Sequence, residues 1–234
     1  MENIKVVALF VTACLCYLRH VSAIEVPDVY TEVHKRLEDR RMKSVAPGEL
    51  DPEYRNVTVG LYLVNIVQLN TRDNFLDAVY WIVLKNNDPR LTWNHTSPET
   101  MVLSNSKIWI PDIEIFNGLN KMEYLTVHDA IVGKEGHVVR VPAVKFRVPC
   151  AEEDNNNITC GIMLGSWMYN TNVLQTVVEG EGVDLQFLNP NPKWSVVGSS
   201  AKQNEISFKV AGADSNFSHV EYSLTFQSRD KCRK

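Results

Sequence analysis

The sequence predicts an all-β protein: an immunoglobulin-like, twisted β-sandwich of about ten strands, with one α-helix near the N-terminus. Three observations lead to this prediction. Apolar and polar residues alternate with period two in several segments, turn-forming residues separate these segments, and one stretch near the start has helical spacing. No repeat or low-complexity tract divides the chain, and its mature part of about 210 residues has a size that a single sandwich reaches.

The helix is expected over residues 29–41. Its apolar residues recur every four positions and would form one stripe along the helix, at Val29, Val33 and Leu37. Asp28 stands immediately before them and suits an N-cap, and basic residues gather at the far end, where the helix dipole favours positive charge.

Strands are expected after Pro47. Alternation is clearest in residues 57–63 and 220–226, which predicts a sheet with one buried face. Further β-rich segments lie at 75–84, 137–148, 161–169 and 206–210. Turn chemistry separates them at 86–89 (Asn-Asn-Asp-Pro), 117–118 (Asn-Gly), 135–136 (Glu-Gly) and 189–192 (Asn-Pro-Asn-Pro).

The first residues have the pattern of a secretion signal. Lys5 precedes an apolar run, and Val21-Ser22-Ala23 provides small residues for cleavage, so residues 1–23 are expected to be a signal peptide and residues 24–234 the mature domain. The apolar run is too short to span a bilayer. Its removal changes the formal net charge from −4 to −5. This mildly acidic balance argues against nucleic acid as a partner, and the predicted location is extracellular.

Cleavage would leave three cysteines, Cys150, Cys160 and Cys232. In an oxidising compartment Cys150 and Cys160 are the obvious pair, and closing so short a loop would stabilise the fold by roughly 2.5 to 3 kcal/mol. Cys232 is then either a free thiol or a bridge between two chains. Asn-x-Ser/Thr acceptors, which indicate a secreted glycoprotein, occur at Asn56, Asn94, Asn157 and Asn216.

The sequence contains no recognisable catalytic or metal-binding motif. It lacks His-Glu-x-x-His, Gly-x-Ser-x-Gly and a Gly-rich phosphate loop, and its histidines show no ligand-like spacing. His128-Asp129 is an adjacent acid-base pair, but neighbours in a strand point to opposite faces, so a solvated turn is the better interpretation. We therefore expect no enzyme, no metal and no cofactor.

Aromatic residues occur in specific local settings along the chain. In order, these are Trp93-Asn94, Ile108-Trp109-Ile110-Pro111-Asp112, Phe116-Asn117, Gly165-Ser166-Trp167 and the pair Phe208 and Phe217 around a turn. This order, with the cysteine pair just before Gly-Ser-Trp, resembles the extracellular domain of Cys-loop pentameric ligand-gated channels, in particular the soluble acetylcholine-binding proteins. The resemblance covers essentially the whole mature chain.

The resemblance implies a homopentameric ring with a small-molecule site at each subunit boundary. On the principal side, the matching positions are Phe116 for loop A, Trp167 for loop B, and Phe208 and Phe217 for loop C. An indole face attracts a protonated or quaternary amine, so an amphiphilic amine is one candidate ligand. Simple core packing is the alternative for any strand tryptophan, and it is retained for Trp93 and Trp109, which the family uses structurally.

The chain departs from the cholinergic pattern in ways that bear on the ligand. Its loop C has no vicinal cysteines, and phenylalanines stand where the family has tyrosines, so hydroxyl hydrogen bonds to a ligand are lost. On the complementary side the matching positions are Asn86 for loop D and Ile131, Val139 and Val141 near loop E. The expected wall is apolar with one amide, and acetylcholine binding is doubtful.

Two interpretations of the whole protein stay open beside the preferred one. The preferred interpretation is a secreted homopentameric binder, because the residues between Cys150 and Cys160 are acidic and amide-rich, whereas channel subunits of the family present an aromatic and proline tip there. The alternatives are a channel subunit truncated before its first membrane helix and a pentameric scaffold that has lost its ligand.

Overall fold

The computed structural model describes residues 28–126, 128–153 and 157–229, so the expected signal peptide and Cys232 lie outside the described residues. The chain divides into two units, residues 1–36 and 37–234. The first unit contributes helix α2 (Asp28–Arg36), which carries an ion pair of 3.7 Å between Glu32 and Arg36.

The expected end of the helix at residue 41 is wrong, because α2 stops at Arg36 and a separate short helix, α3 (Arg41–Ser44), begins five residues later. The side chain of Asp39 offers the physical reason. Its Oδ1 accepts hydrogen bonds from the Arg41 backbone N at 2.9 Å and from Arg41 Nε at 3.1 Å. Such a local side-chain to backbone bond competes with helix continuation.

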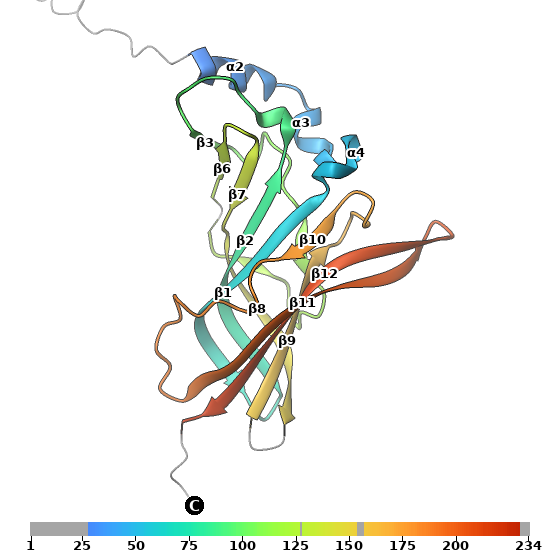
Figure 1. Ribbon diagram of the computed structural model, residues 1–234. Coiled ribbons are helices and arrows are strands. Elements are labelled where there is room, and N and C mark those ends of the chain that lie inside the picture. Colours follow the sequence, from blue (N-terminus) through green and yellow to red (C-terminus); the bar gives the residue numbers. More distant parts are fainter. Residues whose placement is uncertain (1–27, 127, 154–156, 230–234) are drawn as a thin grey trace, which may run out of the picture. The chain divides into compact units, whose positions relative to one another are not determined.

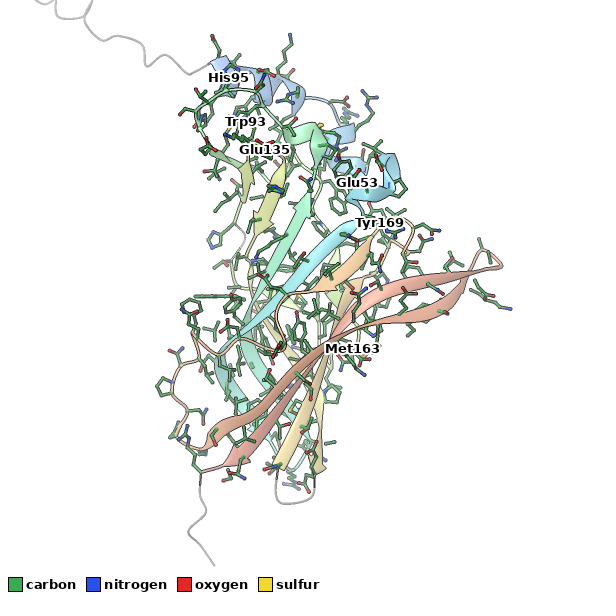
Figure 2. All side chains as sticks on the ribbon, in the orientation of Figure 1. Glu53, Trp93, His95, Glu135, Met163 and Tyr169 are labelled. Carbon is green, nitrogen blue, oxygen red and sulfur yellow. A yellow bond between two sulfur atoms is a disulfide. The ribbon has the colours of Figure 1, made fainter. Side chains whose placement is uncertain are left out.

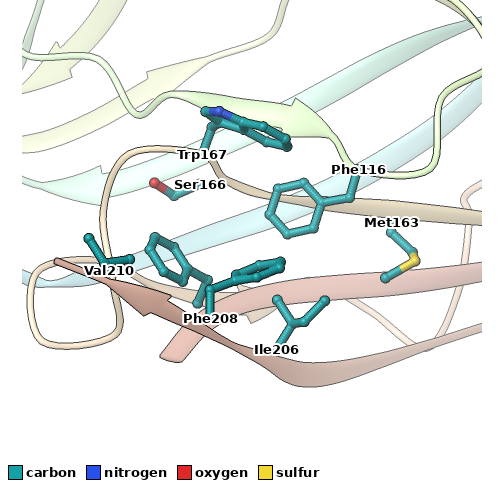
Figure 3. Close-up of a pocket in the computed structure, with 8 residues that line it drawn as sticks. Phe116, Met163, Ser166, Trp167, Ile206, Phe208 and Val210 are labelled. Carbon is teal, nitrogen blue, oxygen red and sulfur yellow. The ribbon is translucent and has the colours of Figure 1, made fainter. Parts of the chain in front are cut away.

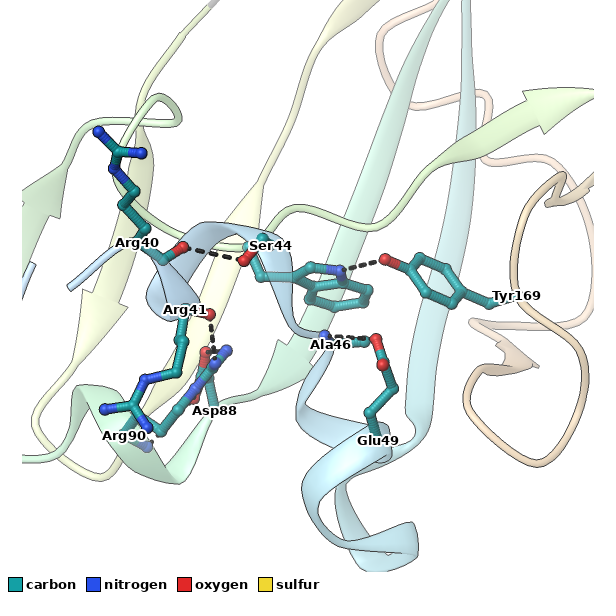
Figure 4. Close-up of polar contacts among 9 residues, drawn as sticks. Arg40, Arg41, Ser44, Ala46, Glu49, Asp88, Arg90 and Tyr169 are labelled. Carbon is teal, nitrogen blue, oxygen red and sulfur yellow. Dashed lines mark hydrogen bonds and ion pairs between the residues drawn. The ribbon is translucent and has the colours of Figure 1, made fainter.

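Two further helical turns precede the first strand and were not expected from the sequence: α4 (Pro47–Leu50) and the 3₁₀ turn η1 (Pro52–Tyr54). In each, a proline opens the helical turn, where its missing N–H has no cost. The Glu49 carboxylate also accepts a hydrogen bond of 3.0 Å from the Ala46 N–H, as Figure 4 shows. These turns place the chain at the start of the first strand.

An arginine connects this N-terminal segment to the first hairpin. The buried carboxylate of Asp88 accepts hydrogen bonds from Arg90 Nε at 2.8 Å and Arg90 Nη2 at 2.6 Å. Arg90 Nη1 also donates to the carbonyl oxygen of Arg41 at 3.0 Å, so one guanidinium joins α3 to the loop after β2 (Figure 4). Asp88 is 1 % exposed, and a buried charge of this kind is stable only when it is paired.

The described residues of the second unit form twelve connected strands, whose arrangement Figure 1 shows. Their bounds are β1 (Asn56–Asn70), β2 (Phe75–Asn87), β3 (Thr100–Leu103), β4 (Ile113–Ile115), β5 (Glu123–Tyr124), β6 (Ala130–Gly133), β7 (His137–Arg140), β8 (Ala143–Glu153), β9 (Asn157–Ser166), β10 (Gln175–Val178), β11 (Trp194–Val210) and β12 (Ala213–Ser228). A 3₁₀ turn, η2 (Pro89–Leu91), follows β2.

Two sheets face each other, and β8 belongs to both. Its first part, residues 143–149, pairs with β2 in the sheet that also holds β1, β3, β5, β6, β7 and β10. Its last part, residues 150–153, pairs with β9 in the sheet of β4, β11 and β12. Cys150 stands opposite Cys160 in this second ladder, and the two form the predicted disulfide.

The core confirms the predicted β-sandwich. The alternating apolar residues of β1 and β12 are buried, and Tyr222 Oη donates a hydrogen bond of 2.7 Å to the carbonyl of Val59 between the sheets. Trp93 and Trp109 are 6 % and 5 % exposed, which confirms their structural interpretation. Trp93, labelled in Figure 2, donates its indole N–H to the carbonyl of Pro98 at 2.9 Å.

The predicted strands exist, but their bounds differ. The segment expected at 137–148 is two strands, β7 and β8, because Pro142 lies between them and cannot donate to a ladder. The segments expected at 206–210 and 220–226 are the ends of a much longer hairpin of β11 and β12. Pairing between β11 and β12 runs from Trp194 to Val210, and it extends both strands beyond the residues whose alternation is visible in the sequence.

Candidate functional site

A pocket of about 420 Å³ lies between the end of β9 and the β11–β12 hairpin (Figure 3). It is lined by Phe116, Met163, Ser166, Trp167, Ile206, Phe208, Val210 and Phe217. The four aromatic residues expected from the sequence on the principal side are therefore brought together, although they lie as far as 101 positions apart in the chain.

The hairpin supplies one side of the pocket. At its tip, Ala211 and Gly212 both have positive φ, 51° and 87°, as a tight two-residue turn of the I′ type requires. This turn sets the register, so Ile206 stands opposite Phe217 and Val210 opposite Ala213. Alternate residues share a face of a strand, which places Ile206, Phe208, Val210 and Phe217 on the pocket side.

Trp167 supplies the other side. It follows the last residue of β9, Ser166, and its side chain is 66 % exposed in the single chain. Its ring makes an edge-on contact with Phe116 at a centroid distance of 5.8 Å and an interplanar angle of 74°. Phe208 and Phe217 make a similar contact at 5.9 Å and 65°.

A carboxylate holds the backbone that carries Trp167. Ser166 Oγ donates to Asp112 Oδ1 at 2.6 Å, and Asp112 Oδ2 accepts from the N–H groups of Trp167 at 3.1 Å and Met168 at 2.7 Å. Charge-assisted bonds of this type are short and strong. The direction of the chain after β9 therefore depends on the side chain of Asp112.

Phe116 rests on a buried histidine. The ring centroids of Phe116 and His219 are 5.7 Å apart, and His219 is 2 % exposed. Behind them, a Cβ on Gly165 would lie 2.8 Å from Phe116 Cζ, so only glycine leaves room for this ring. His219 Nε2 lies 3.3 Å from Glu221 Oε1. A hydrogen bond from Lys202 is the main cause that lowers the pKa of Glu221.

The residues expected on the complementary side lie elsewhere in the same chain. Ile131, Val139 and Val141 are on or beside β6 and β7, and none of them lines this pocket. Ile131 is opposite Val139 in the ladder, and both share a face with Val102 of β3, so they form an outward apolar row. Ile131 and Val102 are 51 % and 68 % exposed.

Asn86 is placed differently from the expectation. Its side chain is only 8 % exposed and alternates on β2 with the same inward face as Ile82 and Leu84. The side chain that β2 presents outward at this point is Lys85, which is ion-paired with Glu179. The expectation placed Asn86 on the outward face, but the outward residue is its neighbour Lys85. Successive side chains of a strand point to opposite faces, so an error of one residue exchanges an outward side chain for an inward one.

The sequence interpretation missed Met163, Ser166, Ile206 and Val210 as pocket residues. A signal for three of them was present: Met163 precedes Trp167 by four positions on one strand face, and Ile206 and Val210 alternate with Phe208. Ser166 is the direct neighbour of Trp167, so strand alternation would place the two side chains on opposite faces. Ser166 lines the pocket nevertheless, because β9 ends at this residue and the alternation does not continue beyond it. Figure 2 labels Met163 on β9.

The predicted glycosylation acceptors lie at the surface to different degrees. Asn56, Asn94 and Asn216 are exposed, whereas Asn157 is half-buried at the start of β9. Asn216 alternates with Phe217, which lines the pocket, and therefore points to the other face of the hairpin. There its Oδ1 accepts from Ser207 Oγ at 2.7 Å.

Comparison with known proteins identifies relatives of the chain. A neuronal acetylcholine receptor subunit beta-2 from Gallus gallus is 22% identical over 176 residues, which are 71% of this chain and 35% of that protein. The acetylcholine receptor subunit beta-type unc-29 from Caenorhabditis elegans is 25% identical over 167 residues, 66% of this chain and 34% of that protein. This chain therefore spans about a third of the length of these relatives.

The fold also matches a solved structure. A crystal structure of AChBP, an acetylcholine-binding protein from Bulinus truncatus, superimposes with a TM-score of 0.69 at 24% identity, covering 86% of this chain and 98% of that one. Within residues 28–229, apart from the undescribed gaps, no helix has the length and apolarity that crossing a membrane requires. The family model of the neurotransmitter-gated ion-channel ligand binding domain matches residues 30–229. The chain belongs to this family of ligand-binding domains.

Proposed function

We propose that this chain is a secreted, homopentameric protein that binds small organic molecules at its subunit boundaries. The observation that carries the proposal is the gathering of Phe116, Trp167, Phe208 and Phe217 around one open pocket. Trp167 is 66 % and Phe208 is 53 % exposed in the single chain. Aromatic surface of this kind, rimmed by strands, is typical of a binding site that a partner or a ligand covers.

A second copy of the chain supplies the missing wall in this proposal. The outward apolar row is formed by Val102, Ile131 and Val139, with Val141 beside it. In the single chain Val102, Ile131 and Val141 are exposed and Val139 is half-buried. The pocket and the row are different surfaces of one chain, so joining them makes a head-to-tail contact, which closes into a ring when the rotation allows. Asn86 is left out of this wall because it is buried.

Secretion is supported by the N-terminal sequence and by the disulfide between Cys150 and Cys160. The described residues next to the disulfide, Ala151, Glu152 and Glu153, are exposed. An acidic segment of this kind favours contact with water over contact with a membrane domain. The second candidate is the ligand-binding part of a channel subunit, and it is favoured by one observation: the relatives are about three times as long.

The proposal is tested in two steps. Light scattering on the purified mature protein is expected to give the mass of five chains, and a monomer at high concentration would reject the ring. A thermal-shift screen of amines, amino acids and apolar compounds is then expected to find at least one class that stabilises the assembly.

The role of the pocket is tested with a matched pair of variants. Trp167→Ala is expected to weaken binding of a compound found in that screen by more than about tenfold, because it removes the largest ring of the pocket. Met168→Ala changes the neighbouring side chain, which is 73 % exposed and does not line the pocket, and should leave affinity unchanged. Equal affinity of both variants in an intact pentamer would reject the site.

A further inference from the structure

The pocket offers a ligand almost no free polar group. Ser166 is the polar side chain among the lining residues, and its hydroxyl hydrogen is committed to Asp112 Oδ1 at 2.6 Å. Ser166 Oγ in turn accepts a hydrogen bond from the N–H of Tyr169 at 2.9 Å. The hydroxyl therefore serves the fold, and the remaining lining side chains are aromatic or aliphatic, with the indole N–H of Trp167 as their single donor.

Two acids near the pocket, Asp112 and Glu221, are already paired. Both oxygens of Asp112 accept hydrogen bonds from residues 166–168. Glu221, on the same face of β12 as Phe217, forms an ion pair of 2.7 Å with Lys202 and contacts His219. Neither carboxylate lines the pocket. A cation that entered would have no free counter-charge among the described lining residues.

Glu114 is the other acid near Phe116. It precedes Phe116 by two positions and stands opposite Gly165 in the β4–β9 ladder, outside the pocket lining. Burial is the main cause that raises its pKa, and the charge of Asp112 adds to it. Glu114 therefore does not supply a carboxylate to the pocket lining.

The rings themselves are arranged for apolar contact. In both edge-on pairs, Phe116 with Trp167 and Phe208 with Phe217, the edge of one ring faces the π-face of the other. Phenyl faces attract cations less than an indole does. Three of the four rings are phenyl, and no carboxylate stands among the lining residues, so the pocket would attract a cation through its rings alone.

We infer that this pocket selects uncharged apolar ligands, aromatic or branched hydrocarbon in character, over cations of the same shape. The inference rests on the proposed function, because it concerns the ligand class of that same site. The proposed second wall agrees with it: Val102, Ile131 and Val139 are apolar, and the charge of Lys85, which is in register with Val139, is compensated by its ion pair with Glu179. This ligand class separates the chain from the amine binder that its aromatic residues first indicate.

The test uses two compounds of matched shape on the assembled mature protein. Phenyltrimethylammonium carries a quaternary nitrogen where tert-butylbenzene carries a quaternary carbon, so the pair differs in charge alone. Titration followed by tryptophan fluorescence and by calorimetry at pH 7 is expected to show at least tenfold tighter binding of tert-butylbenzene. Equal or tighter binding of the cation would overturn the inference and leave the proposed function standing.

Failure of the proposed function has a different signature. If neither compound binds and the thermal-shift screen finds no stabilising class, the binding function falls and the ligand class with it. A bound compound of either charge supports the site, and the ratio of the two affinities decides the ligand class.

A matched pair of variants tests the electrostatic argument directly. Val210→Glu places a carboxylate on the pocket side of the hairpin, at a position that is 49 % exposed and tolerant of charge. It is expected to reduce the preference for tert-butylbenzene at least tenfold. Lys209→Gln makes the same change in net charge on the opposite face of β11 and should leave the preference unchanged. If both variants changed the ratio of the two affinities equally, the effect would not depend on a charge inside the pocket, and the inference would be overturned.

Discussion

The carboxylate of Asp112 lies 2.6 Å from Ser166 Oγ and joins the segment before β4 to the end of β9. Its second oxygen accepts the N–H groups of Trp167 and Met168 at 3.1 and 2.7 Å. One carboxylate from the Trp-x-Pro-Asp segment thus satisfies the backbone of the Gly-Ser-Trp segment. This is a physical reason why the two motifs occur in the same chain, and it makes the position of Trp167 depend on Asp112.

Asp112→Ala is therefore expected to destabilise the protein by about 2 to 4 kcal/mol, because hydrogen bonds to a charged group contribute about 1.5 to 3 kcal/mol each and are not additive. Urea unfolding measures the change. Asp214→Ala removes the same charge from an exposed position on the hairpin and should change the free energy of unfolding by less than about 0.5 kcal/mol. A small effect of both substitutions would show that the Asp112 bonds do not hold the segment.

Gly165 and Gly161 lie on the same strand, β9, and substitution by alanine is expected to change stability differently at the two positions. A Cβ at Gly165 would lie 2.8 Å from Phe116 Cζ, His219 Cβ and the carbonyl oxygen of Ser218, so Gly165→Ala is expected to cost about 1 to 3 kcal/mol and to displace Phe116. A Cβ at Gly161 meets nothing within 4 Å. Gly161→Ala should be neutral or slightly stabilising. Thermal unfolding of both variants checks this order, and reversed effects would contradict the packing described here.

Two buried tyrosines differ in their hydroxyl groups. Tyr80 is fully buried and stacks on Phe146 at 4.4 Å, and its hydroxyl has no hydrogen-bond partner among the described residues. Burial is the main cause that raises the pKa of Tyr80. Tyr80→Phe removes a buried polar group and is expected to raise the free energy of unfolding by about 1 kcal/mol.

Tyr222→Phe is the matched control. The Tyr222 hydroxyl donates to the carbonyl of Val59 at 2.7 Å, and the same carbonyl oxygen also accepts from the Glu179 N–H at 2.9 Å. Tyr222→Phe therefore removes one of two hydrogen bonds to this oxygen and is expected to cost about 0.5 to 1.5 kcal/mol. Chemical denaturation of the two variants under one condition gives the comparison. Destabilisation by Tyr80→Phe equal to that by Tyr222→Phe would show that the Tyr80 hydroxyl has a partner.

The ion pair of Glu221 with Lys202 predicts a dependence of stability on pH. The hydrogen bond from Lys202 lowers the pKa of Glu221 from its usual 4.5. A depressed pKa in the folded state means that the contribution is present above about pH 4.5 and is lost as the pH falls through the folded value. Lys202 is 67 % exposed, so water screens the pair and the contribution should stay below about 1 kcal/mol.

A double-mutant cycle with Glu221→Gln and Lys202→Gln isolates this pair from His219, which also contacts Glu221. The coupling energy, measured by urea unfolding between pH 3 and 7, is expected to be largest near pH 7 and to decrease toward the acid end. A coupling that stays constant over this range would mean that the charge of Glu221 does not contribute.

Much of the fold could be read from local patterns. Alternation in residues 57–63 and 220–226 identified the strands of the core, and the spacing of Cys150 and Cys160 identified the disulfide, since each of these signals lies within one segment. The helix end and the turns before β1 could not be read in this way. They depend on side chains such as Asp39 and Glu49, whose bonds to the backbone carry no periodic signature.

For the site, the sequence by itself determined the aromatic inventory and the family resemblance, because residue types and motif order are properties of the chain alone. Only the tertiary structure decided that Phe116, Trp167, Phe208 and Phe217 surround one pocket, since a hairpin register and the Asp112 bonds bring them together. It also decided that Asn86 points inward. The facing of a strand residue changes with a single step of register, and that step is set by pairing with strands far away in the sequence.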